Sequence, residues 1–214
     1  MMINNLNEKL DKIFPDAKCE LNYSKDYELL IATVLSAQCT DKRVNEVTKI
    51  LFDKYDLEKL SVSNIKEIEN IIRPCGSQNK KSKYIIEIAK SLIKNYNGIV
   101  PNNRTYLENL PGVGRKTTNV VLSNLYNIPA IAVDTHVSRV SKRLKLAKNN
   151  DDVLTIEKKL MKKIPKDKWS RSHHQLVLFG RYICKAKNPL CNECIFYDDC
   201  TSKDKIKRDD IDGK

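Results

Sequence analysis

The amino-acid sequence predicts an all-α protein, and three observations carry this prediction. Apolar residues recur at helical spacing through most of the chain, which predicts about ten helices. Glycine is scarce, at 6 of 214 residues, so few positions interrupt a helix. Strand signals are nearly absent, because the short apolar run at 128–133 contains Pro129, which disfavours a place inside a sheet.

The helical repeat is clearest before residue 100. The stretch 27–35 is apolar almost throughout, which is typical of a buried helix, and the three stretches that follow it are amphipathic. Pro74 and Gly76 end the third stretch. Further along, Thr105 and Glu108 have the spacing of a capping box, in which each side chain satisfies a free amide at the helix start. The four stretches are 27–35, 44–52, 65–72 and 84–93.

Composition narrows the classes of function. The 39 Lys and Arg residues exceed the 27 Asp and Glu residues, and the net charge of +12 favours a polyanionic partner such as nucleic acid. No apolar run approaches the ~18 residues that a membrane-spanning helix needs. Residues 1–11 lack the basic-then-apolar layout of a signal peptide. We therefore expect a cytoplasmic protein without a membrane partner.

Residues 110–121, LPGVGRKTTNVV, join a glycine-bearing turn to a helix that starts near Arg115. Gly112 and Gly114 allow a tight turn that exposes successive backbone N–H groups. These groups, with the positive end of the helix, suit a phosphate oxygen. An ordinary corner between two helices would explain Gly112 by itself. It explains less well two glycines followed at once by Arg-Lys-Thr, so we interpret the segment as a phosphate-binding hairpin.

Residues 133–136, Val-Asp-Thr-His, open another predicted helix. Aspartate directly before a helix is a preferred N-cap, and this explanation of Asp134 is sufficient by itself. His136, Arg139 and Arg143 follow at the i, i+3 and i+7 spacing that places side chains on one face. The sequence leaves open whether that face is simply solvated or forms a basic surface toward a polyanion.

Four of the seven cysteines gather near the C-terminus with the spacing C-x6-C-x2-C-x5-C. In a reducing cytosol such a cluster indicates a metal site rather than disulfides. Four thiolates can hold either zinc or a 4Fe–4S cluster. Only one spacing is the short hook of structural zinc sites, and the pattern also differs from that of ferredoxins, so both metals stay open. The four residues are Cys184, Cys191, Cys194 and Cys200.

Together these motifs closely resemble the endonuclease III family, bifunctional DNA glycosylases of the helix-hairpin-helix superfamily. The hairpin, the Val-Asp-Thr-His segment and the cysteine spacing occur in the family's order, and LSAQCTD at 35–41 is similar to its LSAQxTD segment. The likeness covers nearly the whole chain. It implies a base-excision-repair enzyme that removes oxidised pyrimidines from duplex DNA. It also implies cleavage of the abasic site by β-elimination through a lysine Schiff base.

The resemblance further implies two helical lobes that flank a DNA-binding cleft. A six-helix lobe at 19–129 would contain the hairpin, and residues 1–18 with 130–214 would form a lobe that carries a 4Fe–4S cluster on the four cysteines. Lys116 would be the nucleophile and Asp134 the second catalytic residue. The partner would be double-stranded DNA with damaged pyrimidines or abasic sites, bound by a cytoplasmic monomer that is nucleoid-associated in a prokaryote.

The resemblance also implies which residues contact DNA. Gln38 matches the glutamine that fills the gap left by a flipped base, and the hairpin and the helix after Asp134 supply the others. One segment departs from the family: residues 76–79 read Gly-Ser-Gln-Asn, where the family has an apolar residue that wedges into the duplex. The sequence leaves open whether Ser77 or Gln78 acts as the wedge. The expected contacts are Gln38, Gly112, Gly114, Arg115, Thr117, His136, Arg139 and Arg143.

Two other functions compete with this interpretation. A monofunctional mismatch glycosylase of the superfamily would carry serine or tyrosine at position 116, neither of which offers an amine, so Lys116 disfavours it. A non-catalytic helix-hairpin-helix DNA-binding module would need backbone amides and positive charge. It would not need Lys116 together with Asp134.

Overall fold

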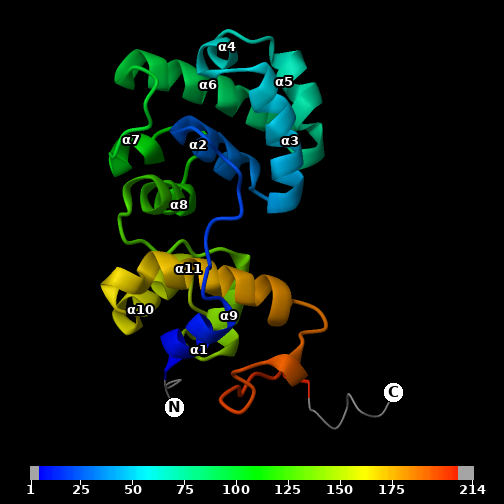
Figure 1. The fold of residues 1–214 in the computed structure, drawn as a ribbon, viewed down its shortest axis with the longest axis vertical. Coiled ribbons are helices and arrows are strands. Elements are labelled where there is room, and N and C mark those ends of the chain that lie inside the picture. The colour runs from blue at the N-terminus through cyan, green and yellow to red at the C-terminus, as the bar shows by residue number, and fades with distance from the viewer. Residues whose placement is uncertain (1–4, 207–214) are drawn as a thin grey trace. The chain divides into compact units, whose positions relative to one another are not determined.

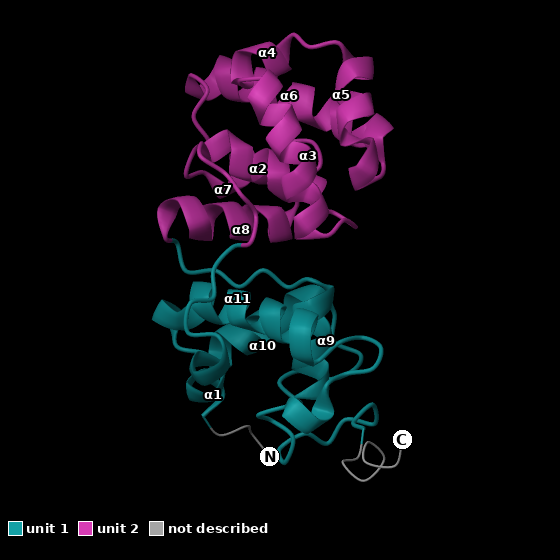
Figure 2. Ribbon diagram, turned by 45° about the vertical axis from the view of Figure 1, so that its right-hand side comes forward, with its two compact units in different colours: residues 1–19, 128–214 teal, residues 20–127 magenta. Residues whose placement is uncertain are grey.

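The computed structural model describes residues 5–206, and in that range it contains helices and no β-strand (Figure 1). The predicted all-α class is therefore confirmed. The chain divides into two compact units (Figure 2). Among the described residues, unit 1 comprises 5–19 and 128–206, and unit 2 comprises 20–127. The boundaries expected from the sequence, after residues 18 and 129, lie within two residues of this division.

Unit 2 is organised around α2, which packs against α3, α6 and α8. Leu29, Leu30 and Ile31 of α2 have no exposed surface, which explains the continuous apolar sequence of this helix. The predicted buried helix is thus confirmed. The helices of unit 2 are α2 (Asp26–Leu35), α3 (Asp41–Lys54), α4 (Leu57–Ser61), α5 (Ile65–Ile72), α6 (Gln78–Tyr96), α7 (Arg104–Glu108) and α8 (Arg115–Tyr126), with a short 3-10 turn, η1 (Arg73–Cys75).

The predicted capping box at α7 is wrong. The N-cap residue is Asn103, whose side-chain oxygen accepts a hydrogen bond of 3.0 Å from the N–H of Tyr106. Glu108 instead forms an ion pair of 2.9 Å with Arg104 one helical turn away. Asparagine is as good an N-cap as threonine, and the helix starts two residues earlier than the capping-box pattern suggested.

The longest described helix, α6, is amphipathic along its 19 residues. Ile85 and Ile88 are buried, whereas Lys83 and Glu87 on the other side are exposed. Among the helices described, none combines the length and the apolar character required to cross a lipid bilayer.

Unit 1 brings together two distant parts of the chain, because α1 packs on α11. Leu6 and Leu10 of α1 share one apolar core with Phe179 and Phe196. The rings of Phe179 and Phe196 lie edge to face with centroids 5.3 Å apart, which attaches the cysteine-rich segment to the helices. The elements are α1 (Leu6–Ile13), α9 (Thr135–Arg143), α10 (Val153–Lys163) and α11 (Trp169–Leu178), the 3-10 turns η2 (Lys166–Lys168) and η4 (Cys191–Glu193), and a π-helical turn, η3 (Phe179–Ile183).

Candidate functional site

The predicted hairpin forms in unit 2 between α7 and α8. The N–H of Val113 closes its turn by donating to the carbonyl of Leu110 at 3.1 Å. Gly112 has a φ of +75°, and a Cβ added there would lie 2.5 Å from Cδ2 of Tyr84. Only glycine fits such a position. Val113 is buried and anchors the turn to the core, whereas Gly112 and Gly114 are exposed.

Helix α8 begins at Arg115, as predicted, with Gly114 as its N-cap residue. No side-chain hydrogen bond caps this helix, which leaves its positive end suited to an anion. Arg115 and Lys116 are exposed in the first turn. Thr117 is only 9% exposed, so its side chain packs inside unit 2. The expected contact of Thr117 with DNA stays a prediction.

Asp134 caps α9 in unit 1. Its Oδ1 accepts a hydrogen bond of 2.8 Å from the N–H of Val137, so the predicted N-cap is confirmed. The cap holds the half-buried carboxylate in one orientation, and the positive end of α9 stabilises its negative charge. A carboxylate held in this way can still accept a proton or face a cation. The capping role and the expected catalytic role are therefore compatible.

Arg139 and Arg143 require a correction. Both guanidinium groups were expected to contact DNA, but both form hydrogen bonds inside unit 1. Arg139 donates to the carbonyl of Cys184 at 3.1 Å. Arg143 donates to the carbonyl of Lys185 at 2.6 Å and forms an ion pair of 2.9 Å with Asp204. Helical spacing showed that the two arginines share a face, and the structure shows that the cysteine-rich segment covers it.

His136 lies on the same face of α9, with Nδ1 3.3 Å from a guanidinium nitrogen of Arg139. The π-helical turn η3 approaches α9 closely at Gly180, where an added Cβ would lie 2.9 Å from Cβ of His136. Glycine thus permits the contact between α9 and η3. His136 is half-buried, and its expected contact with DNA stays a prediction.

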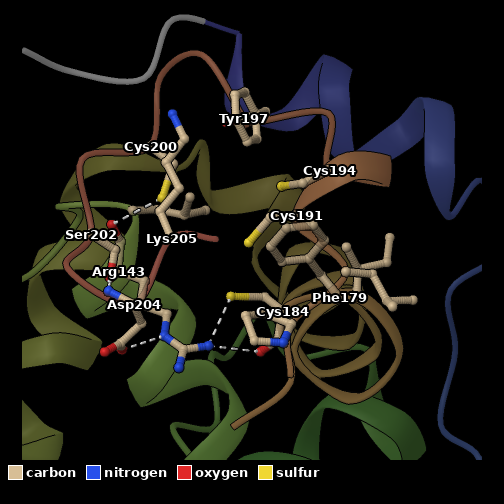
Figure 3. A pocket seen from close by; sticks show the side chains of 14 residues that line it. Arg143, Phe179, Cys184, Cys191, Cys194, Tyr197, Cys200, Ser202, Asp204 and Lys205 are labelled. Atoms are coloured by element: carbon tan, nitrogen blue, oxygen red, sulfur yellow. Dashed lines mark hydrogen bonds and ion pairs between the residues drawn. The ribbon is translucent and has the colours of Figure 1, made fainter. Parts of the chain in front are cut away.

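The four cysteines of the predicted metal site line one pocket in unit 1 (Figure 3). Cys184 follows η3, Cys191 is the first residue of η4, Cys194 directly follows η4, and Cys200 follows the next turn. None of them is in a disulfide. Burial raises the pKa of the Cys194 thiol to about 11 and also raises that of Cys184, which the nearby Arg143 partly offsets. A bound cation that stabilises thiolates would reverse these shifts.

The four cysteines of the pocket supply sulfur donors, which can bind a zinc ion or an iron–sulfur cluster. Four cysteine thiolates are the ligands that iron–sulfur clusters use, and Nη1 of Arg143 lies 3.5 Å from Sγ of Cys184 to balance their charge. The donor set therefore fits the predicted 4Fe–4S cluster.

Two exposed turns of unit 2 carry the remaining expected DNA residues. Gln38 follows α2 and has a φ of +58°, whereas Gly76 and Ser77 precede α6 with φ of +70° and +50°. Buried Lys81 of α6 contacts the backbone of both turns. The sequence does not predict the burial of Lys81, because lysine is rarely buried and Lys81 stands beside Lys80 and Lys83, which are exposed.

Comparison with known proteins defines the class of this site. Residues 31–166 match the family model described as HhH-GPD superfamily base excision DNA repair protein. Residues 184–200 match the iron–sulfur binding domain of endonuclease III. The fold and the site thus define a base excision DNA repair protein with an iron–sulfur cluster, and the 4Fe–4S prediction is confirmed over zinc.

Curated relatives narrow this class. Endonuclease III of Bacillus subtilis is 50% identical over 188 residues, which is 87% of this chain and 86% of the relative. Endonuclease III of Escherichia coli is 42% identical over 193 residues, which is 90% of this chain and 91% of the relative. The chain belongs to the endonuclease III family. It is a DNA glycosylase with abasic-site lyase activity, and neither of the two competing functions is favoured.

Two solved structures resemble the chain at the level of the fold and the sequence. One is a non-covalent endonuclease III–DNA complex and the other a trapped endonuclease III–DNA covalent intermediate. Each has a TM-score of 0.88 and 51% identity and covers 91% of this chain. This chain covers 91% of the first structure and 92% of the second.

Proposed function

We propose that this chain removes oxidised pyrimidines from duplex DNA and that Lys116 is the nucleophile of both glycosylase and lyase steps. The observation that carries the proposal is an exposed amine in the first turn of α8, directly after a glycine hairpin suited to phosphate. A hairpin that grips the backbone would place this amine beside the sugar. The trapped covalent intermediate of a 51% identical relative supports an amine nucleophile.

The chemistry begins when the damaged nucleotide leaves the base stack. The Nζ of Lys116 attacks C1′ of the sugar, and the bond between C1′ and the base breaks with the electron pair leaving on the base. Loss of a proton from nitrogen and opening of the sugar ring produce a Schiff base. Removal of a proton from C2′ then expels the 3′ phosphate by β-elimination. Water hydrolyses the imine and releases Lys116.

Asp134 has the properties that these steps require of a second group. Its carboxylate is held by the N–H of Val137 and can stabilise the positive charge that develops on the sugar when the base leaves. It can also accept a proton from the attacking amine. We therefore assign Asp134 as the catalytic carboxylate, while it continues to cap α9.

Cys184, Cys191, Cys194 and Cys200 would hold the iron–sulfur cluster through their thiolates. When bound, the cluster supplies four metal–sulfur attachments to a short loop that has little regular structure of its own. Arg139 and Arg143 then connect this loop to α9, whose first residue follows Asp134. We assign the cluster a structural role in holding α9, and no reaction step depends on it.

The contacts with duplex DNA are assigned to groups on the exposed turns and the hairpin, and to the half-buried His136. Arg115 and the amides of the hairpin would bind phosphates, and His136 would lie near the DNA backbone. Gln38 would fill the gap left by the flipped base, with Ser77 or Gln78 entering from the other exposed turn. The protein would act in the cytoplasm and, in a prokaryote, at the nucleoid, because its substrate is chromosomal DNA.

Borohydride trapping tests the assignment of Lys116, since borohydride reduces an imine to a stable amine. Wild-type protein should become covalently attached to a duplex with thymine glycol or an abasic site, and it should not act on a G/T mismatch. Lys116→Gln should bind the same duplexes but lose trapping and strand cleavage. Lys83→Gln, which removes another exposed lysine of unit 2, is the matched control. Trapping by Lys116→Gln would move the nucleophile to another residue.

A further inference from the structure

The side chain of Lys81 is enclosed by three backbone carbonyls of unit 2. It is 5% exposed, and Nζ donates to the carbonyls of Leu35 at 2.9 Å, Ala37 at 2.7 Å and Cys75 at 2.8 Å. An ammonium group has three protons, so these acceptors satisfy it completely. Leu35 and Ala37 lie at the C-terminal end of α2, where the helix dipole also favours a positive charge.

This cation is not required to fill space. Burial lowers the pKa of the Lys81 ammonium, and the groups within residues 5–206 to which its Nζ donates are neutral backbone carbonyls rather than a carboxylate. Burying an ammonium group costs free energy that an apolar side chain of similar length would avoid. The three carbonyls are therefore the reason for a lysine here, because an apolar residue could not hold them together.

The carbonyls belong to two segments that are far apart in sequence. In each segment, the residue whose carbonyl binds Lys81 is followed directly by an exposed residue with positive φ. Gln38 follows Ala37, and Gly76 and Ser77 follow Cys75. The acceptors on Ala37 and Cys75 both lie within 2.8 Å of one nitrogen atom. One cation thus sets the separation of the two turns.

We propose that Lys81 is a positioning residue that holds the turn at 36–40 and the turn at 75–78 as a single rigid element for entry into duplex DNA. This inference rests on the proposed function, in which Gln38 and Ser77 or Gln78 enter the duplex around a flipped nucleotide. Lys81 does not touch DNA in this role. It acts by holding both exposed turns in their binding conformation, so that binding to DNA does not cost the conformational entropy of ordering them.

Lys81→Met tests this role, since methionine has a similar length and no donor. On a thymine glycol duplex, excision should fall roughly tenfold to a hundredfold, as expected when a positioning contact is lost. On a single-stranded abasic oligonucleotide, which requires no duplex opening, borohydride trapping should stay within about twofold of wild type. Lys80→Met, an exposed neighbour on α6, is the matched control and should leave both activities unchanged.

The thiol of Cys75 provides a second measurement. Cys75 is 2% exposed, and burial raises its pKa to about 12, so iodoacetamide should label it very slowly in the native wild-type protein. Lys81→Met should increase labelling of the peptide that contains Cys75 about tenfold or more, because the turn is no longer held. The Lys80→Met control should keep the slow rate.

The outcomes separate this inference from the proposed function. Equal losses on duplex and single-stranded DNA, or unchanged excision with unchanged labelling, would overturn the role of Lys81. Absence of trapping by the wild-type protein would instead overturn the assignment of Lys116. If Lys81→Met does not fold, Lys81→Gln makes the same comparison, because its amide can donate to two of the three carbonyls. The ratio of activity on duplex DNA to activity on single-stranded DNA should be lower for Lys81→Gln than for the wild-type protein, but higher than expected for a variant without any donor at position 81.

Discussion

The aromatic ring of Tyr84 occupies the space that any side chain at Gly112 would need. A Cβ at residue 112 would lie 2.5 Å from Cδ2 of Tyr84, and the φ of Gly112 is +75°. The Tyr84 ring, which belongs to α6, therefore packs against the hairpin turn and requires glycine at position 112. Gly114, two residues later, has a φ of −103° and no atom within 4 Å of an added Cβ.

This contrast predicts different effects for two similar substitutions. Gly112→Ala should lower the free energy of unfolding by roughly 2 to 4 kcal/mol, from the left-handed backbone and the overpacked ring, and should weaken DNA binding. Gly114→Ala should cost less than about 1 kcal/mol, because only the quality of the N-cap changes. Urea denaturation and DNA titration measure both effects. Similar losses for the two variants would contradict the contact with Tyr84.

Substitutions of Asp134 should separate capping from catalysis. Asp134→Asn keeps an oxygen that can accept from the N–H of Val137, so stability should change little, while base excision should fall about a hundredfold or more because the charge is lost. Asp134→Ala should lose the same activity and also about 1 kcal/mol of stability. An Asp134→Asn protein with nearly full excision would restrict Asp134 to its capping role.

Arg143→Met distinguishes a loop-holding arginine from a phosphate contact. Because Arg143 donates to Lys185 and lies 3.5 Å from Sγ of Cys184, the cluster absorbance near ~400 nm should decay several-fold faster on exposure to a chelator. In the control variant Lys142→Met, which changes the neighbouring residue on α9, the absorbance should decay at the wild-type rate. A phosphate contact would instead leave the cluster stable and reduce the salt dependence of DNA binding by about one counterion.

The N-cap of α10 should make stability depend on pH. Asp152 accepts a hydrogen bond of 2.7 Å from the N–H of Thr155, and this bond holds the pKa of the Asp152 carboxyl below its usual value of 3.8. A carboxyl whose pKa is lowered in the folded state contributes its full stabilisation at pH values above its unfolded-state pKa. That stabilisation is lost as the pH falls through the folded-state pKa.

Asp152→Asn is the matched variant, since its amide oxygen can still cap α10 but does not titrate over this range. Urea denaturation at pH 7 and at pH 3 should show a smaller acid-induced loss of stability for Asp152→Asn than for the wild-type protein. Identical losses in the two proteins would show that the Asp152 hydrogen bond does not contribute to acid sensitivity.

Much of this protein was predictable from contiguous sequence. Periodicity identified the buried helix 27–35, and the glycine-bearing turn indicated that α8 starts near Arg115. Both features depend on residues within a few positions of one another. Asp134 was identified as an N-cap for the same reason. The cysteine spacing indicated a metal site, because four thiolates in so short a segment have few other uses in a reducing environment.

The tertiary structure decided which of these side chains are available. It placed Thr117 inside unit 2, covered Arg139 and Arg143 with the cysteine-rich segment, and enclosed Lys81 among three carbonyls. The carbonyl of Leu35 is 46 residues from Lys81 in sequence, and that of Lys185 is 42 residues from Arg143. A local pattern can place a charged residue on a helix face, but burial and hydrogen bonding depend on which distant segment packs against that face.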